Sequence, residues 1–219
     1  MTPLNLAVLA SGGGTNLQAV LDAIASGRLR ARVRVVISNK PDAGALDRAR
    51  RHDIPALHLA RDQFPTADAF ADHLLAVLSD YQIDLIILAG YLKKLHPRVV
   101  QAYRHRVLNI HPALLPSFGG KGMYGIHVHE AVIAAGVKVS GVTVHLSDEE
   151  YDHGPIVAQR PVPVLDDDTP ESLAGRVLEV EHQLYPEIIQ LFAEGRVRVD
   201  GRRAYIKDEG SGVRSQGSA

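Results

Sequence analysis

The chain has 219 residues, of which 46% are hydrophobic and 22% are charged, so it is long enough to bury the core of one largish domain. Its 24 basic and 25 acidic side chains give a formal net charge of −1, which excludes the strong field expected of a protein that binds nucleic acid or an anionic membrane. Without cysteine, the chain has no disulfides, cysteine–zinc sites, iron–sulfur clusters or cysteine nucleophile. We therefore expect a cytoplasmic protein with neither a signal peptide nor a membrane span.

Residues 4–110 alternate between apolar strands and amphipathic helices. Strands are predicted at residues 4–10, 33–37, 56–59, 83–89 and 106–110, and helices at residues 15–24, 43–51, 67–78 and 98–103. Residues 83–89 form a continuous apolar run, which is typical of a central strand that is buried on both faces. The alternation predicts a doubly wound, mostly parallel α/β sheet whose ligands bind beyond the carboxyl ends of the strands.

The rest of the chain is predicted to be less regular. Residues 111–126 are rich in glycine and proline and form a long loop, and long loops are often functional. After it we expect a helix at residues 128–135, strands at 139–146 and 156–164, an acidic loop at 147–155, a long helix from about residue 170 and a hairpin at 197–206. We also expect Pro186 to kink or restart the long helix, the hairpin to turn at Asp200-Gly201, and residues 207–219 to be disordered.

A glycine-rich turn, Ser11-Gly-Gly-Gly-Thr-Asn16, joins the first predicted strand to the first helix. It places the backbone N–H groups of Gly13, Gly14, Thr15 and Asn16 at the positive end of that helix, where a phosphate binds well. The turn lacks the third glycine of the dinucleotide motif and the Gly-Lys-Thr of a Walker motif, so a mononucleotide or a sugar phosphate fits better. The alternative is an ordinary tight turn whose glycines supply positive φ angles.

An amide and an imidazole end the fifth predicted strand. Alternation along that strand puts Asn109 and His111 on one face, at the carboxyl end. Such a pair can hydrogen-bond a carbonyl oxygen that becomes an oxyanion and can move a proton, as acyl transfer to an amine requires. Asp152 in the acidic loop is the candidate carboxylate that raises the pKa of His111 and fixes its tautomer. The alternative is a surface or packing histidine beside a solvated acidic loop.

Two lysines follow the predicted central strand. Lys93 and Lys94 lie between Leu92 and Leu95, and form either a solvated loop or the rim of a pocket that attracts an acidic ligand tail. Glu181, in the long helix, lies either on an exposed face or buried near a cationic amine.

Two histidines raise the question of a metal. His127 and His129 point to different sides of a helix, so a metal site would need further ligands that the sequence does not identify. We therefore expect no metal.

Several short motifs between residues 4 and 206 carry a resemblance to a known family. They are Ser11-Gly-Gly-Gly-Thr-Asn-Leu-Gln18, Ile37-Ser-Asn-Lys40, Leu88-Ala-Gly-Tyr91, Leu108-Asn-Ile-His-Pro-Ala-Leu-Leu-Pro116, Gly141-Val-Thr-Val-His145, Tyr151-Asp-His-Gly-Pro-Ile156 and Val180-Glu-His-Gln-Leu-Tyr-Pro186. Together they resemble the phosphoribosylglycinamide formyltransferase family, folate-dependent enzymes of purine synthesis. The resemblance implies a formyltransferase fold with a Rossmann-like N-terminal half. It further implies one domain over residues 1–206, in which 4–110 bind phosphate and 111–206 carry the folate site and catalysis.

The resemblance also implies a reaction, in which the formyl group of 10-formyltetrahydrofolate passes to the amine of 5-phosphoribosylglycinamide without a metal. Asn109 would hold the formyl oxygen, protonated His111 would act on the tetrahedral intermediate and transfer a proton, and Asp152 would sustain the charge of His111. The phosphorylated acceptor would contact Gly13, Gly14, Thr15, Asn16 and Glu181, and the folate would contact Leu92, Lys93, Lys94, Leu95, Asn109, Asp148, Glu149, Glu150 and Tyr151.

The sequence departs from the family pattern in three places. Lys94 replaces a residue that is apolar in many relatives, and residues 65–67 lack an arginine that helps the folate site in some of them. The loop at residues 118–126 is longer than in some members, and we expect it to be a mobile flap whose Lys121 approaches the substrate phosphate.

Other functions use parts of the same residue set. A formyltetrahydrofolate hydrolase would share the chemistry of Asn109, His111 and Asp152 with water as the acceptor, but such hydrolases usually carry an additional N-terminal domain. A methionyl-tRNA formyltransferase would need an RNA-binding domain and a basic surface. A non-catalytic nucleotide-binding module would use the glycine turn alone. We expect small-molecule substrates as partners, no nucleic acid or membrane, and a monomer or homodimer.

Overall fold

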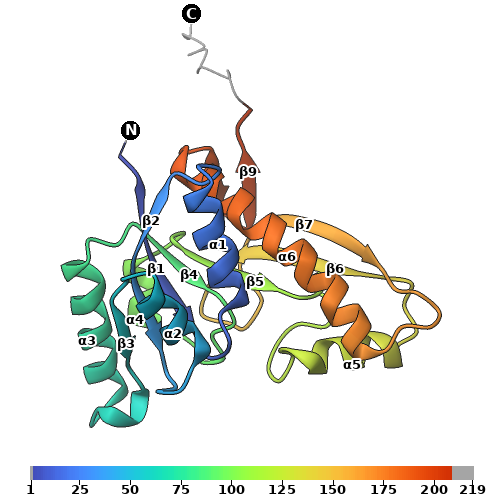
Figure 1. Cartoon of the computed structure of the whole chain (residues 1–219), viewed down its shortest axis with the longest axis horizontal. Coiled ribbons are helices and arrows are strands. Elements are labelled where there is room, and N and C mark those ends of the chain that lie inside the picture. The colour runs from blue at the N-terminus through green and yellow to red at the C-terminus, as the bar shows by residue number, and fades with distance from the viewer. Residues whose placement is uncertain (1, 209–219) are drawn as a thin grey trace, which may run out of the picture.

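One mixed sheet of nine strands runs through the computed structural model, which describes residues 2–208 (Figure 1). The strands are β1 (Leu4–Ala10), β2 (Ala31–Ser38), β3 (Ala56–His58), β4 (Leu85–Leu88), β5 (Val107–His111), β6 (Val139–Leu146), β7 (Ile156–Pro163), β8 (Val197–Asp200) and β9 (Arg203–Ile206). Their order is β3-β2-β1-β4-β5-β6-β7-β9-β8. Strands β1 to β5 are parallel, whereas β6 is antiparallel to both β5 and β7. The predicted fold class, a doubly wound and mostly parallel α/β sheet, is confirmed.

Helices cover both faces of the sheet. They are α1 (Thr15–Ala25), α2 (Gly44–Arg51), α3 (Ala67–Asp80), α4 (Pro97–Ala102), α5 (Ile126–Ala134) and α6 (Pro170–Ala193), and a short 3-10 helix, η1 (Arg61–Gln63), precedes α3. Alternation along β1 sends Leu6 and Val8 into the core beneath α1, α2, α5 and α6, while Ala7 and Leu9 enter the core beneath α3 and α4. Figure 1 shows α1 and α6 crossing in front of the sheet. No helix within residues 2–208 has the length and apolar character needed to cross a bilayer.

Three local predictions need correction or lie outside the structure. Helix α6 continues without a restart through Pro186 to Ala193, because buried side chains on both sides of the proline, among them Tyr185 and Ile189, hold it against the sheet. The hairpin pairs Asp200 with Arg203, so its turn lies at residues 201–202, one position later than predicted. Residues 209–219 of the predicted disordered tail lie outside the described residues.

The sheet topology brings several loops to one edge. Residues 11–14, 90–95 and 112–125 leave the parallel strands β1, β4 and β5 at their carboxyl ends, where β5 ends at His111. Because β6 is antiparallel to β5, residues 147–155 leave β6 beside the start of β5, and Asp152 in this loop comes within 3.7 Å of His111. Ser11 N donates a hydrogen bond to the Gly90 carbonyl at 3.0 Å and joins two of these loops, whereas Ser147 N donates to the Val107 carbonyl, at the start of β5, at 2.9 Å. Functional side chains from distant parts of the sequence therefore converge here.

Candidate active site

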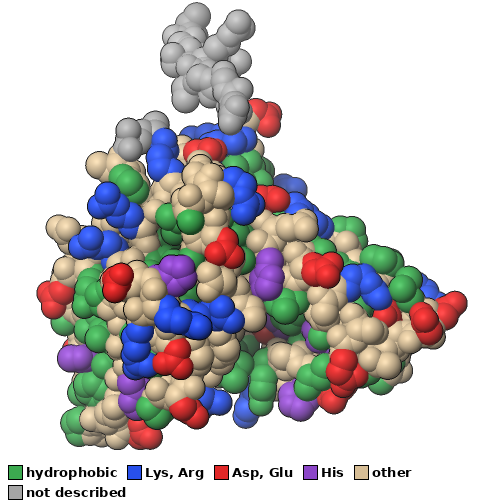
Figure 2. Space-filling view, in the orientation of Figure 1, with side chains coloured by type: hydrophobic (Ala, Val, Ile, Leu, Met, Phe, Trp, Pro, Cys, Tyr) green, Lys and Arg blue, Asp and Glu red, His purple; other side chains and the backbone are tan. Residues whose placement is uncertain are grey.

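A cavity of about 650 Å³ opens beyond the carboxyl ends of β4 and β5. Most of the predicted site residues line it, namely Asn16, Leu92, Lys93, Lys94, Leu95, Asn109, His111, Asp148, Glu150, Tyr151, Asp152 and Glu181. Figure 2 shows the surface hollowed between the N-terminal half and the projecting part that carries α5, β6 and β7. The volume is within the range of small-molecule sites in proteins.

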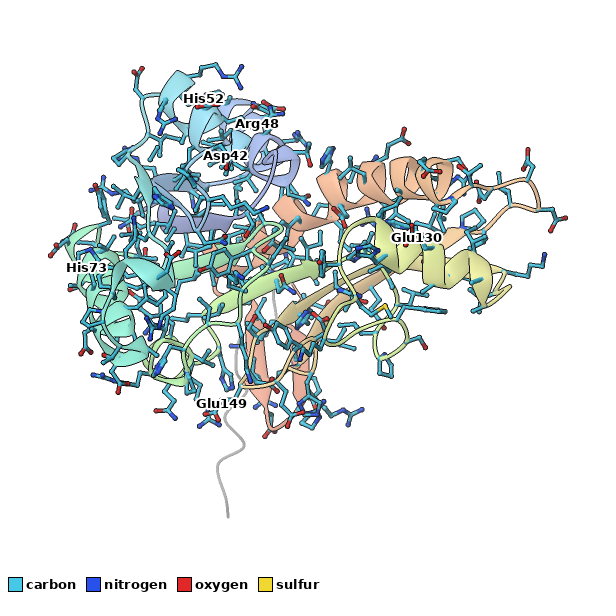
Figure 3. The ribbon with its side chains drawn as sticks, turned by 90° about the horizontal axis from the view of Figure 1, so that it is seen from below. Asp42, Arg48, His52, His73, Glu130 and Glu149 are labelled. Carbon is cyan, nitrogen blue, oxygen red and sulfur yellow. The ribbon has the colours of Figure 1, made fainter. Side chains whose placement is uncertain are left out.

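Four predicted contacts lie beyond the lining of this cavity. Gly13, Gly14 and Thr15 stand next to it, before and at the start of α1, while Asn16 reaches into the lining. Glu149 was expected to contact folate, but its carboxylate accepts a hydrogen bond from Gln101 Nε2 at 3.2 Å, on the outer side of the loop. Figure 3 shows Glu149 at the edge of the molecule, and Glu149 is not among the residues that line the cavity. The prediction for Glu149 is therefore not supported by its position.

His111 is the buried end of β5, with 3% of its surface exposed. Its Nε2 lies 2.8 Å from the Phe118 carbonyl, and because a carbonyl oxygen only accepts, Nε2 carries a proton. Its Nδ1 lies 3.7 Å from Oδ2 of Asp152. Phe118 rather than Asp152 thus sets the tautomer of the neutral ring, which differs from the sequence-based expectation.

Asp152 is held as an ionised carboxylate. Its backbone has φ 54°, in the left-handed region, and its Oδ2 accepts a hydrogen bond from Gly120 N at 2.9 Å. Burial by itself raises the pKa of Asp152, but the neighbouring imidazoles of His145 and His111 and the hydrogen bond from Gly120 N together lower it. The carboxylate is therefore available as a negative partner for an imidazolium.

The pKa of His111 is lowered from its ordinary value. Burial is the largest cause and outweighs the opposing effects of the Asp152 charge and the hydrogen bond to the Phe118 carbonyl, and His145 lowers the pKa further. Asp152 thus acts in the predicted direction, but the predicted net rise is wrong. The sequence contains the carboxylate but not the depth at which the imidazole is buried.

His145 on β6 is a neighbour of Asn109 that the sequence reasoning missed as a site residue. The antiparallel pairing of β5 and β6 sets His145 opposite Asn109. The Nδ1 of His145 donates to the Leu146 carbonyl at 3.0 Å, so Nε2 is left to accept from Asn109 Nδ2, also at 3.0 Å. This bond fixes the side-chain amide of Asn109 in the cavity. The motif ending in His145 was the only signal for it in the sequence.

Of the two histidines on α5, His129 belongs to the cavity. It is 4% exposed, it lines the cavity, and its Nδ1 has no hydrogen-bond partner among the described residues. His127 is exposed and pairs with Glu130 at 3.0 Å. Within residues 2–208, no group of three or more histidine, aspartate or glutamate side chains is arranged to hold a metal ion.

A second buried carboxyl group lies across the cavity on α6. Glu181 is 7% exposed and its Oε2 accepts a hydrogen bond from Asn16 Nδ2 at 2.7 Å. Burial raises the pKa of Glu181 to about 7, although the bond from Asn16 opposes the rise. The Oδ1 of Asn16 is buried and has no partner among the described residues. The pair can therefore accept hydrogen bonds from an amine or a hydroxyl group that enters the cavity.

The glycine turn leaves the start of α1 open to an anion. Gly14 precedes the helix with φ 74°, and no side chain within the described residues caps it. The first-turn N–H groups of α1 therefore have no partner from a capping side chain, as a phosphate site at a helix N-terminus requires.

The wall made by residues 91–95 is tied to the base of the glycine turn. Leu92 N donates to Ser11 Oγ at 2.9 Å, and Ser11 Oγ donates in turn to Asn39 Oδ1 at 2.5 Å.

At the rim of the cavity, the Lys94 ammonium lies 5.9 Å from the centre of the Tyr151 ring, and this contact joins the wall to the acidic loop. Lys121 in the loop after β5 also lines the cavity.

Comparisons with known proteins agree with this arrangement. A family model described as formyl transferase matches residues 4–189. The chain is 45% identical over 194 residues to a chloroplastic phosphoribosylglycinamide formyltransferase of Arabidopsis thaliana. The aligned residues make up 88% of this chain and 66% of that protein. It thus spans slightly less than two thirds of the plant relative. It is 37% identical over 216 residues to phosphoribosylglycinamide formyltransferase of Escherichia coli, with 99% of each chain covered.

A solved structure shares the whole fold. The crystal structure of glycinamide ribonucleotide transformylase 1 from Symbiobacterium toebii superposes with a TM-score of 0.88, at 46% identity, over 94% of this chain and 95% of the other. The family match, the relatives and the structural likeness agree with the sequence motifs. The chain belongs to the formyl transferase family, in the group whose members are named phosphoribosylglycinamide formyltransferase.

Proposed function

We propose that this protein transfers the formyl group of 10-formyltetrahydrofolate to the amine of 5-phosphoribosylglycinamide, which yields the N-formyl product and tetrahydrofolate in purine synthesis. The observation that carries the proposal is that Asn109, His111 and Asp152 line the same cavity as Asn16 and Glu181. The first three supply the groups that acyl transfer needs, and the other two accept hydrogen bonds from an amine or hydroxyl of the acceptor.

The cavity fits a folate as the formyl donor, whose formyl carbon is the electrophile of the reaction. Leu92 and Leu95 give its wall an apolar surface, and the half-buried Asn109 amide supplies a donor for the formyl oxygen. Lys93 and Lys94 at the rim are exposed cations that attract the acidic tail of a folate. The apolar wall, the polar interior and the cationic rim match the parts of such a molecule.

The catalytic roles follow from the electrostatics of His111. Its two nitrogens face acceptors, the Phe118 carbonyl and the Asp152 carboxylate, so a second proton on the ring has two stabilising neighbours. Burial, and to a smaller extent the neighbouring His145, oppose that charge. As the acceptor amine attacks and the formyl oxygen becomes negative, the field at His111 favours the imidazolium, and His111 takes the proton that the amine releases. His111 then gives this proton to the folate nitrogen as the bond between that nitrogen and the formyl carbon breaks, which releases tetrahydrofolate and regenerates the neutral ring. Asn109 Nδ2 stabilises the oxygen.

The acceptor binds on the other side of the reacting carbon. Asn16 and Glu181 hold its ribose or amine end, and the N–H groups of Gly13, Gly14, Thr15 and Asn16 bind its phosphate at the start of α1. Lys121 adds a cation from the loop after β5. The direct attack of the amine needs no covalent enzyme intermediate and no metal.

The same domain holds both substrates in this proposal. Residues 1–206 act as one unit, in which 4–110 bind the phosphate of the acceptor and 111–206 carry the folate and catalytic groups, and the single continuous sheet supports this. The protein acts on small molecules, as a monomer or homodimer, in the cytoplasm.

A formyl-transfer assay tests the proposal against a hydrolase. The donor is 10-formyl-5,8-dideazafolate, and its deformylation is followed spectrophotometrically with and without phosphoribosylglycinamide. Turnover that depends on the acceptor and yields its N-formyl derivative supports the transferase. Release of formate at the same rate without the acceptor would assign the protein to the hydrolases, and no deformylation under either condition would refute folate chemistry.

A further inference from the structure

The glycine turn before α1 is packed against the beginning of α2. The Gly12 carbonyl accepts a hydrogen bond from Ala45 N at 3.1 Å, and the Gly13 carbonyl accepts one from Arg48 Nε at 2.8 Å. The C=O and N–H of a trans peptide point in opposite directions. These two bonds therefore turn the N–H groups of Gly13 and Gly14 away from α2 and fix the orientation of both peptides.

The contact between the turn and α2 is too close for side chains. A Cβ on Gly14 would lie 2.8 Å from Cα of Ala45, and Gly14 also has φ 74°. A Cβ on Gly44 would lie 3.2 Å from Cα of Gly13. Because the backbones touch, the turn cannot move toward α2, and the bond from Arg48 prevents the Gly13 carbonyl from rotating away.

Arg48 links three segments with one guanidinium group. While Nε bonds to the turn, Nη1 donates to Gln18 Oε1 on α1 at 3.0 Å. The side chain is half-buried on α2, and Figure 3 places it between Asp42 and His52 at the side of the molecule opposite Glu149. Two bonds from adjacent nitrogens need the planar fork of arginine, and the single ammonium of a lysine does not reproduce them.

We propose that Arg48 is a positioning residue for the phosphate of the acceptor. It holds the Gly13 carbonyl so that the N–H groups of Gly13 and Gly14 stay directed at the phosphate, although Arg48 itself lies outside the lining of the cavity. This inference rests on the proposed function, which supplies the phosphorylated ligand. It adds a residue of α2 to a site otherwise built from α1 and α6.

Isothermal titration with phosphoribosylglycinamide tests the role in the full-length protein. The variants are Arg48→Met, Arg48→Lys and, as a matched control, Arg51→Met, which removes an exposed arginine from the same helix. We expect both Arg48 variants to bind the ligand about tenfold or more weakly, and Arg51→Met to bind it within about twofold of wild type. Affinity for 10-formyl-5,8-dideazafolate should stay within about twofold in all three.

A second ligand separates positioning of the phosphate site from a general loss of structure. Glycinamide riboside lacks the phosphate, so Arg48→Met should not change its affinity, while the preference for the phosphorylated ligand falls. Equal weakening of both ligands, or wild-type affinity in Arg48→Met, would overturn the inference. Wild-type affinity in Arg48→Lys would also overturn it, because charge alone would then suffice. If the wild-type protein does not bind phosphoribosylglycinamide, the proposed function itself fails.

Discussion

Nδ1 of His111 lies 3.7 Å from Oδ2 of Asp152, a distance typical of an ion pair but too long for a hydrogen bond. Both side chains are instead bonded to the loop after β5, His111 to the Phe118 carbonyl at 2.8 Å and Asp152 to Gly120 N at 2.9 Å. The conformation of this loop therefore sets how closely the imidazole and the carboxylate approach each other. The loop also closes one side of the cavity.

Replacing Asp152 by Asn should lower the pKa of His111 further. The carboxylate is the main group that favours the charged ring, and without it burial acts with less opposition. The pKa is measured by NMR titration of the imidazole signals. Glu149→Gln, in the same loop but bonded to Gln101, is the control and should leave the pKa of His111 unchanged. An unchanged or raised pKa in Asp152→Asn would show that the two groups are not coupled.

Replacing Glu181 by Gln should change how stability depends on pH. Burial raises the pKa of Glu181 from 4.5 to about 7, so the folded protein binds this proton more tightly than the unfolded chain. The stability that this tighter proton binding contributes is fully present below pH 4.5, and it is lost as the pH rises to about 7. Glutamine does not titrate, so only wild type loses this stability. The free energy of unfolding of Glu181→Gln minus that of wild type should therefore rise by roughly 2–4 kcal/mol between these two pH values.

Urea unfolding at several pH values measures this difference. Glu179→Gln, which replaces an exposed carboxylate on the same helix, is the control. Parallel pH profiles for wild type and Glu181→Gln would contradict the raised pKa.

Replacing Tyr185 by Phe should destabilise the fold by about 1–3 kcal/mol, because buried carbonyls would lose their partner. The hydroxyl of the fully buried Tyr185 lies 2.8 Å from the Leu108 carbonyl of β5 and 3.0 Å from the Leu88 carbonyl of β4. Chemical denaturation measures the change, with Tyr205→Phe, an exposed tyrosine, as the control. Equal stability of the two variants would argue against this bridge.

Replacing Lys94 by Met should raise the KM for a folate donor with a polyglutamate tail several-fold, and more at low ionic strength, because the exposed ammonium attracts the tail through a screened field. The kcat and the KM for the acceptor should stay near wild type. Steady-state kinetics at two salt concentrations measure the effect. Lys138→Met, which breaks an ion pair with Asp166 away from the cavity, is the control. An unchanged donor KM would remove Lys94 from the folate site.

Hydrophobic periodicity predicted the fold well where one pattern dominates. The strands at 4–10 and 139–146 have the predicted bounds, because most of their apolar residues face packed layers. The strand expected at 83–89 is shorter, since Ile83 N bonds to the Leu78 carbonyl at the end of α3 instead of to a neighbouring strand. Helix η1 was missed because a single 3-10 turn has no periodicity to detect.

The sequence was sufficient to predict most residues of the candidate site, but it was not sufficient to predict the direction of the pKa shift of His111. Asn109 and His111 follow from alternation along one strand, whereas His145 enters through the pairing of β5 with β6, which local patterns do not determine. The pKa of His111 depends on burial by loops that are distant in sequence, so the lowered value could not be deduced from the nearby carboxylate alone. Arg48 acts through a backbone contact, which leaves no motif of its own.

The most direct test of the catalytic role of His111 is the kcat of His111→Asn with 10-formyl-5,8-dideazafolate and phosphoribosylglycinamide, measured alongside the affinities for both. His73→Asn, which changes an exposed histidine on α3 away from the cavity, is the control (Figure 3). We predict that kcat falls by about two or more orders of magnitude in His111→Asn, while both ligands still bind and the control stays active. Turnover near wild type in His111→Asn would contradict the proposed mechanism.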